Sequence, residues 1–260
     1  MMFFTDQTQR TIELNHFPER IVSVVPSQTE LLFDLNLDDE VIGITKFCIH
    51  PDQWFRTKER VGGTKSLNLQ KIIELKPDLI LANKEENTKE DLEALMQHCA
   101  VWISDIKNLS DACSMIHSVG EMCNRRSIAN ELVSEIRNQI PVVLPELKSA
   151  VYLIWNDPIM AAGTDTFISD MLPYAGFSNA VIKERYPALS DQELQTLNPQ
   201  YILLSSEPFP FNNEHRLDYE KRFPESTILL VDGECFSWYG SRMRLAFPYF
   251  RLLTQQLTGN

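Results

Sequence analysis

Cys48 and His50 are the residues whose types and spacing most directly suggest metal chemistry. A thiolate and an imidazole suit soft metal cations. The sequence offers no further ligands at a matching spacing, and none of its five cysteines belongs to a Cys-x-x-Cys pair. We therefore expect no metal site, and we interpret most of the cysteines as small buried apolar residues.

Sequence motifs of catalysis are absent. The chain contains no Gly-x-Gly-x-x-Gly, P-loop, Gly-x-Ser-x-Gly or His-Glu-x-x-His pattern. An enzyme acting on a small molecule is an alternative only if polar side chains converge within hydrogen-bonding distance of a substrate. The candidates for such a site are Cys48, His50, Glu85 and Asp157.

Aromatic residues gather in loops that follow predicted strands. Open α/β sheets bind ligands beyond the carboxyl ends of their strands, so loop aromatics there favour a stacking surface for a flat or bulky ligand. Arg242, at the start of the last predicted helix, could hold a loop or meet an anionic group of a ligand. The aromatic residues concerned are Phe47, Trp155, Tyr186, Phe236, Trp238 and Tyr239.

These loops must be positioned by strands that alternate with helices along the chain. Such alternation indicates βαβ units and mostly parallel sheets. Ser27 with Glu30, and Ser190 with Glu193, form capping-box patterns that predict helix starts. Residues 110–140 show no strand signal and predict two helices, and we expect the last helix to be interrupted near Pro248. Apolar runs predict strands at 21–25, 41–45, 79–82, 100–104, 150–155, 201–206 and 227–232.

One helix-to-strand unit occurs twice. The stretches NLQKIIELKPDLILA (68–82) and SDQELQTLNPQYILLS (190–205) each join a cap residue, an amphipathic helix, Leu-x-Pro and an apolar strand. The repeat predicts two α/β lobes. We expect an N-terminal lobe over 1–124, a linking helix over 125–146 and a C-terminal lobe over 147–260.

Composition narrows the classes of partner. The net charge of −12 disfavours nucleic acid, which requires a basic face, and also disfavours an anionic membrane surface. No apolar run reaches the roughly 18 residues of a membrane span. The N-terminus lacks the features of a signal peptide, so the sequence as written predicts a cytoplasmic protein, or a periplasmic one if translation starts upstream.

Several blocks together resemble one protein family. RIVSVVPSQTELLFDL, VIGITKFCIHP and RVGGTKSLNLQKIIELKPDLILA are similar to the first lobe of the helical-backbone (class III) periplasmic substrate-binding proteins of ABC importers. GTDTFISDMLPYAGFSNAV, RYPALSDQELQTLNPQYILL and WYGSRMRLA continue the resemblance through the second half. These are receptors for cobalamin, haem and ferric siderophores, and the cobalamin branch is the most similar.

The resemblance implies two Rossmann-like lobes joined by a single long helix, with a ligand cleft between them and no catalysis. It implies a small-molecule or metal-chelate ligand (cobalamin, haem or a ferric siderophore), no intrinsic cofactor and a monomer. Cobalamin receptors often place tryptophans where this chain has Thr64 and Asn83, which leaves the ligand open. By position, the pocket wall falls on Ser27, Phe47, His50, Thr64, Asn83, Met160, Tyr186, Trp238, Tyr239 and Arg242.

The resemblance also implies an ABC permease as partner. The family carries a glutamate on each lobe that pairs with arginines of the permease, and these positions fall on Gln70 and Gln192. A neutral amide cannot supply the charged half of such a pair. We therefore keep a second hypothesis, a cytoplasmic carrier or sensor that has the receptor fold without docking to a transporter. A third is a pure interaction module whose cleft is filled by its own aromatics.

Overall fold

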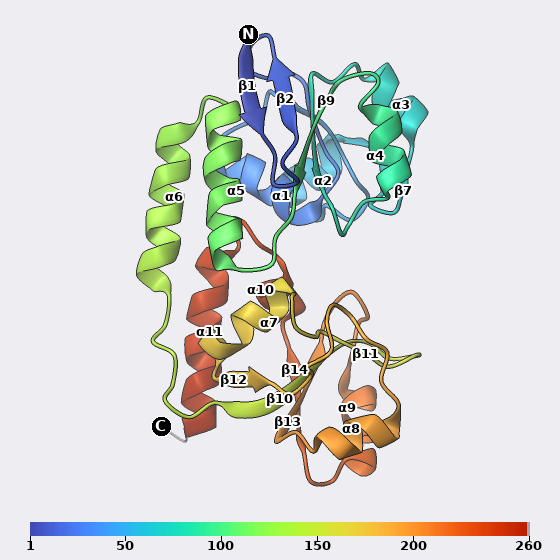
Figure 1. Cartoon of the computed structure of the whole chain (residues 1–260), viewed down its shortest axis with the longest axis vertical. Coiled ribbons are helices and arrows are strands. Elements are labelled where there is room, and N and C mark those ends of the chain that lie inside the picture. Colours follow the sequence, from blue (N-terminus) through green and yellow to red (C-terminus); the bar gives the residue numbers. More distant parts are fainter. Residues whose placement is uncertain (259–260) are drawn as a thin grey trace. The chain divides into compact units, whose positions relative to one another are not determined.

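The computed structural model describes residues 1–258, which form two compact units (Figure 1). Unit 1 comprises Met1–Ile106, Ser110–Arg137 and Tyr239–Arg242. Unit 2 comprises Lys107–Leu109, Asn138–Trp238 and the chain from Met243 onward. The chain therefore returns to unit 1 for four residues close to its C-terminal end.

Unit 1 is built on a parallel sheet with strand order β5-β4-β3-β8-β9. Its core includes Val22, Ile80, Val101 and Leu92, all of them buried. The strands are nearly continuous in apolar residues because helices cover both faces of a parallel sheet. Their bounds are β3 Ile21–Ser23, β4 Val41–Ile44, β5 Glu59–Arg60, β8 Leu79–Asn83 and β9 Ala100–Ser104.

Helices alternate with these strands along the chain. They are α1 Pro26–Asp34, α2 Asp52–Thr57, α3 Leu69–Glu74 and α4 Lys89–Leu95. Two antiparallel hairpins complete the strands of unit 1: β1 Met2–Thr5 with β2 Thr11–Leu14, and β6 Gly62–Gly63 with β7 Ser66–Leu67.

Two helices, α5 Leu109–Met122 and α6 Arg126–Gln139, follow the sheet and lie side by side in Figure 1. They approach closely at Gly120, where a Cβ atom would lie 2.3 Å from Cβ of Ala129. Glycine at this position therefore allows the two helices to pack.

Unit 2 contains a sheet with the path β11-β10-β13-β14, and β12 pairs with β10. The pairing is parallel except at β11, and Val151, Leu153, Ile202 and Leu204 form part of the core. The strands are β10 Lys148–Trp155, β11 Met160–Ala161, β12 Phe177–Asn179, β13 Tyr201–Ser205 and β14 Thr227–Val231. The helices are α7 Phe167–Met171, the 3-10 turn η1 Leu172–Ala175, α8 Asp191–Leu197, α9 Asn213–Arg222, α10 Gly233–Ser237 and α11 Met243–Thr258.

The expected α/β class with mostly parallel sheets is confirmed. The two helices predicted within residues 110–140 are α5 and α6, and α6 ends at Gln139 because prolines follow at 141 and 145. Two other details differ. Helix α11 runs on through Pro248, since buried Phe247 and Phe250 hold it in place. The capping box predicted for Ser27 is wrong: Val25 is the N-cap residue of α1 and makes no side-chain cap bond. The proposed domain limits at 124 and 147 stay a prediction.

Candidate ligand-binding site

The loop after β4 carries the most exposed of the predicted aromatic residues. Phe47 is 51% exposed and Ile49 is 45% exposed. Lys46 Nζ lies 5.1 Å from the centre of the Phe47 ring. The loop is fixed by Cys48, whose Sγ lies 3.1 Å from Thr29 Oγ1. It therefore presents an aromatic and an aliphatic side chain to solvent on a rigid base.

Cys48 has a structural role in this loop. Burial raises the pKa of its thiol above the usual value, so the thiolate that a nucleophile or metal ligand needs is disfavoured. His50 is half-buried two residues later. Among residues 1–258, no three His, Cys, Asp or Glu side chains are grouped to hold a metal ion. The enzyme hypothesis thus loses its candidate nucleophile.

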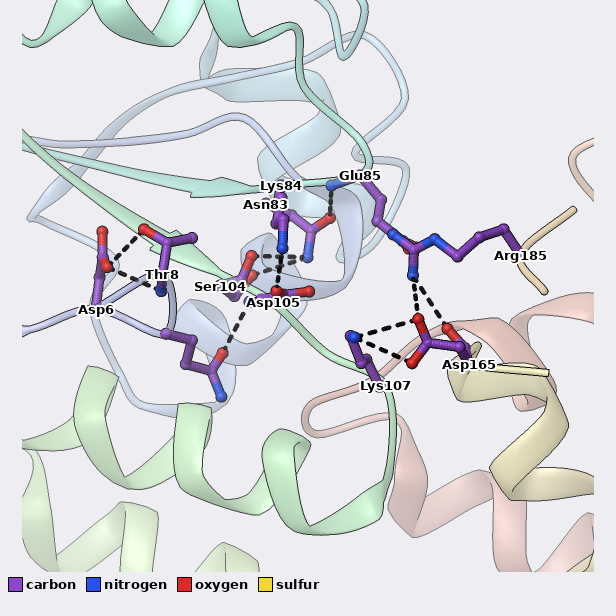
Figure 2. A network of polar contacts seen from close by, with 11 residues as sticks. Asp6, Thr8, Asn83, Lys84, Glu85, Ser104, Asp105, Lys107, Asp165 and Arg185 are labelled. Atoms are coloured by element: carbon purple, nitrogen blue, oxygen red, sulfur yellow. Dashed lines mark hydrogen bonds and ion pairs between the residues drawn. The ribbon is translucent and has the colours of Figure 1, made fainter. Parts of the chain in front are cut away.

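A polar network lies at the carboxyl ends of β8 and β9 (Figure 2). Asn83 Nδ2 donates to Ser104 Oγ at 3.0 Å, and Asn83 Oδ1 accepts from the backbone N–H groups of Glu85, at 2.8 Å, and Glu86, at 3.1 Å. Asn83 is buried, and its amide shapes the loop that follows β8. The half-buried Thr64 lies in a second loop. The backbone oxygen of Thr64 accepts from Asn87 Nδ2 at 3.1 Å.

Tyr239 and Arg242 are anchored within unit 1 by two carboxylates. Tyr239 Oη donates to Glu86 Oε1 at 2.9 Å. Burial raises the pKa of the Tyr239 phenol well above its usual value, so it stays a neutral donor. Arg242 binds both oxygens of Glu30, with Nε–Oε2 at 2.7 Å and Nη2–Oε1 at 2.6 Å. This bidentate ion pair favours the loop-holding interpretation of Arg242. Ser27, on the same helix as Glu30, is buried.

In unit 2, Met160 and Tyr186 are half-buried, and Tyr186 lies two residues before the bridge partner of Met160. Met160 forms an isolated bridge with Ala188. Tyr186 follows Arg185 directly, and Figure 2 shows Arg185 and Lys107 directed at Asp165. Their Nη1 and Nζ atoms lie 3.6 and 3.0 Å from the carboxylate oxygens of Asp165. Exposed ion pairs of this kind contribute little stability, but they orient the segment that carries Tyr186.

Trp238 is also held by a carboxylate. Its Nε1 donates to Glu207 Oε1 at 2.9 Å, and Ser237 Oγ donates to the same oxygen at 2.5 Å. Trp155, at the end of β10, is 40% exposed and donates from Nε1 to the backbone oxygen of Asp157 at 3.0 Å. Unit 2 therefore presents one exposed indole and one buried indole.

Gln70 and Gln192, the expected docking positions, are both exposed on short helices. Gln70 Nε2 donates to Glu74 Oε1 at 2.9 Å. Glu193 accepts from Lys183 Nζ at 2.7 Å and closes a capping box on Ser190, while Asp191 pairs with Arg222. The carboxylates next to the two glutamines therefore have partners in the same unit.

The structure groups seven of the ten predicted pocket residues with unit 1 and the other three, Met160, Tyr186 and Trp238, with unit 2. Sequence reasoning missed the carboxylates that hold this set: Glu30, Glu86 and Glu207. Glu30 gave a misleading local signal as part of a capping pattern. Glu86 and Glu207 gave none, because the residues that they bind are 153 and 31 positions away.

Comparisons with known proteins identify the family of the chain. The periplasmic binding protein family model matches residues 21–222, so the chain belongs to this family. An uncharacterized ABC transporter substrate-binding lipoprotein of Bacillus subtilis is 28% identical over 213 residues, covering 76% of this chain and 67% of its own. A vitamin B12-binding protein of Vibrio vulnificus is 26% identical over 196 residues, covering 72% of this chain and 71% of its own.

The fold is shared with solved receptors. The periplasmic vitamin B12-binding protein of Vibrio cholerae superimposes with a TM-score of 0.76 at 20% identity, over 92% of this chain and 99% of that chain. The family is one of solute-binding proteins, which agrees with the expectation of a receptor and not an enzyme. Across residues 1–258, no helix is both long and apolar enough to cross a bilayer.

Proposed function

We propose that the chain is a receptor for a corrinoid, a haem or a ferric chelate of siderophore type. Membership of the periplasmic binding protein family supports a solute ligand. The observation that carries the class of ligand is the half-exposed Phe47, which lies beside Ile49 and the half-buried His50 in one fixed loop. An apolar face with one polar neighbour suits a large, flat, partly apolar molecule.

The predicted pocket residues divide into two roles in this proposal. In unit 1, Phe47 and His50 are accessible and would contact the ligand; in unit 2, Met160 and Tyr186 are accessible and Trp238 presents only an edge of its indole. The remaining residues, Ser27, Thr64, Asn83, Tyr239 and Arg242, are buried or bonded within the protein, and they would shape the loops that the ligand meets.

We place the receptor outside the cytoplasmic membrane and expect it to deliver its ligand to an ABC permease as a monomer. The relative named as a substrate-binding lipoprotein and the family of periplasmic binding proteins support this location. The comparisons give no support to the cytoplasmic location that the sequence as written predicted.

A carrier or sensor without a transporter is the second candidate. It is favoured by one observation, the uncharged side chains of Gln70 and Gln192 at both expected docking positions. Co-sedimentation with proteoliposomes that contain the cognate permease separates the two candidates. A receptor binds these vesicles, and a carrier stays in the supernatant.

A ligand panel tests the proposed function. Purified protein is titrated with cyanocobalamin, haemin and ferric siderophores, and binding is followed by calorimetry and thermal unfolding. At 100 times its dissociation constant, a ligand adds about 2.7 kcal/mol to the free energy of unfolding. No heat and no thermal shift with any of the panel at saturation would overturn the proposal.

Phe47→Ala is the variant that locates the site. We expect it to weaken binding about tenfold or more, because an aromatic stacking partner is lost. Phe17→Ala is the matched control, since Phe17 is 43% exposed and lies outside the candidate site. Equal affinity of the two variants would place the ligand elsewhere.

A further inference from the structure

Glu207 is a titratable group that the proposed function leaves unused. It follows β13 and lies at the carboxyl edge of the sheet of unit 2. Its Oε1 accepts from Ser237 Oγ at 2.5 Å and from Trp238 Nε1 at 2.9 Å. Ser205 Oγ donates to the backbone oxygen of Glu207 at 2.5 Å and lies 2.9 Å from Tyr152 Oη. The Glu207 carboxylate therefore bonds the end of α10, and the Glu207 backbone oxygen bonds Ser205, which links β13 to Tyr152 of β10.

The surroundings of this acid are unfavourable for a negative charge. Burial raises the pKa of Glu207, and the nearby acids Glu234 and Asp232 raise it further, while the bonds from Ser237 and Trp238 lower it. The titratable groups that face it are thus Asp232 and Glu234 of the α10 start and Tyr152 of β10. Tyr249 of α11 lies beside Asp232, and its Oη accepts from the backbone N–H of Asp232 at 3.0 Å. A carboxylate retained against these costs points to a role beyond stability.

The first residue of α10, Gly233, is packed closely against Glu207. A Cβ atom on Gly233 would lie 2.4 Å from Ser205 Oγ and 2.6 Å from Cγ of Glu207. Any side chain at this position would force the start of α10 away from Glu207. The helix can therefore begin here only because residue 233 is glycine, and this contact keeps Ser237 and Trp238 within reach of the carboxylate.

Trp238 is only 7% exposed, so no more than an edge of its indole can reach a ligand. A small rotation of the indole ring would then turn that edge away from the ligand or expose a different edge to it. We propose that Glu207 is a positioning residue of the ligand site: its carboxylate fixes the orientation of the Trp238 indole, and so sets the affinity for ligand. The proposal rests on the ligand-binding function proposed above. Hydrogen bonds to an ionised acceptor are stronger than neutral ones, which explains why an acid occupies this position.

The first test needs no ligand. Tryptophan emission is recorded between pH 4 and 8 for the wild type and for Trp238→Phe, and the difference isolates Trp238. We expect this difference to titrate with a midpoint above the usual pKa of a glutamate and to become independent of pH in Glu207→Gln. Titration that persists in Glu207→Gln would assign the signal to Asp232 or Glu234, and a flat difference in the wild type would remove the contact; either result overturns the proposal.

The second test measures affinity for cyanocobalamin and haemin by calorimetry. We expect Glu207→Leu to weaken binding about tenfold and Glu207→Gln, which keeps an acceptor oxygen, to weaken it less than threefold. In a Trp238→Phe background, Glu207→Leu should have no further effect, because the two residues act through one contact. Glu225→Gln is the control, since Glu225 is exposed and lies outside the site.

The outcomes separate this inference from the function on which it rests. If the wild type binds and Glu207→Leu binds equally well, Glu207 does not position the site and the inference fails. If the wild type binds neither probe, the ligand class is wrong, and the emission titration alone decides the role of Glu207. If Glu207→Leu does not fold, Glu207→Gln at pH 7 and the pH dependence of wild-type emission supply the test.

Discussion

Helix α3 in unit 1 and helix α8 in unit 2 are two copies of one helix-to-strand unit with different surface chemistry. Both are short, both bury one apolar residue, Ile72 or Leu194, and both end before a proline and a parallel strand. Their third positions carry opposite charges, Lys71 in α3 and Glu193 in α8. Each of these side chains pairs with a group of opposite sign at 2.7 Å, Lys71 with Glu59 and Glu193 with Lys183.

The charge reversal extends to the surrounding chain. Residues 46–76 contain seven basic and three acidic side chains, whereas residues 191–225 contain three basic and seven acidic ones. A partner that contacts both copies would therefore meet a basic surface on one unit and an acidic surface on the other. The duplicated backbone has kept its packing, and its exposed residues have diverged.

The largest effects should come from the buried anchors of the two copies. We expect Ile72→Ala and Leu194→Ala each to lower the free energy of unfolding by about 2–5 kcal/mol, because both side chains are fully buried. Urea unfolding, with amide hydrogen exchange read separately for α3 and α8, measures each loss. A loss below about 1 kcal/mol at one site would show that the two helices are not equivalent in packing.

Capping should distinguish the copies. Asn68 accepts a single bond from the backbone of Lys71, whereas Ser190 and Glu193 cap each other's backbone groups. We expect Asn68→Ala and Ser190→Ala each to cost about 1 kcal/mol, with the larger loss at Ser190 because a reciprocal pair is broken. Hydrogen exchange of the first turn of each helix is the measurement, and a larger loss at Asn68 would contradict the expectation.

The C-terminal ends of the two helices should differ in the opposite sense, with the larger effect at the end of α3. Lys76 and Asn198 both adopt left-handed backbone angles, with φ of 48° and 43°. Asparagine tolerates this region better than lysine does. We expect Lys76→Gly to raise the free energy of unfolding by about 0.5–1 kcal/mol and Asn198→Gly to leave it nearly unchanged. Equal gains at the two positions would show that backbone strain is not concentrated at Lys76.

The smallest effect should be the dependence on pH of the α8 cap. The hydrogen bond from Lys183 lowers the pKa of Glu193 to about 2. Since the folded value lies below the unfolded one, Glu193 stabilises the folded state above about pH 4.5 and loses this contribution as the pH falls toward 2. The difference in stability between the wild type and Glu193→Gln should therefore close over that interval. A difference independent of pH would exclude the ionised carboxylate as the cause.

Local patterns predicted most of the elements that surround the site. The apolar run at 100–104 coincides with β9, and the Ser190–Glu193 capping box begins α8 as predicted. These signals succeed because the interactions responsible span only a few residues. The apolar N-terminal residues, in contrast, form the hairpin β1–β2, which no strand pattern had indicated.

The site could be predicted only in outline, because its organising contacts are long-range. Ser27 and Glu30 matched a capping box, but Glu30 is bound by Arg242, which lies 212 residues away. Phe47 was correctly placed in an exposed loop, whereas Trp238 is buried against Glu207. No local pattern reveals which distant carboxylate an indole or a guanidinium will meet.

The return of Tyr239–Arg242 to unit 1 has a consequence for biosynthesis. A ribosome releases Glu30 and Glu86 long before it adds the residues that bind them. Until residues 239–242 have emerged, the bonds from Tyr239 to Glu86 and from Arg242 to Glu30 cannot form. A nascent chain stalled at residue 238 should therefore fold unit 1 less stably, since it lacks both of these interactions. Unit 1 is synthesised first for the most part, but its completion is in this way a late event of translation.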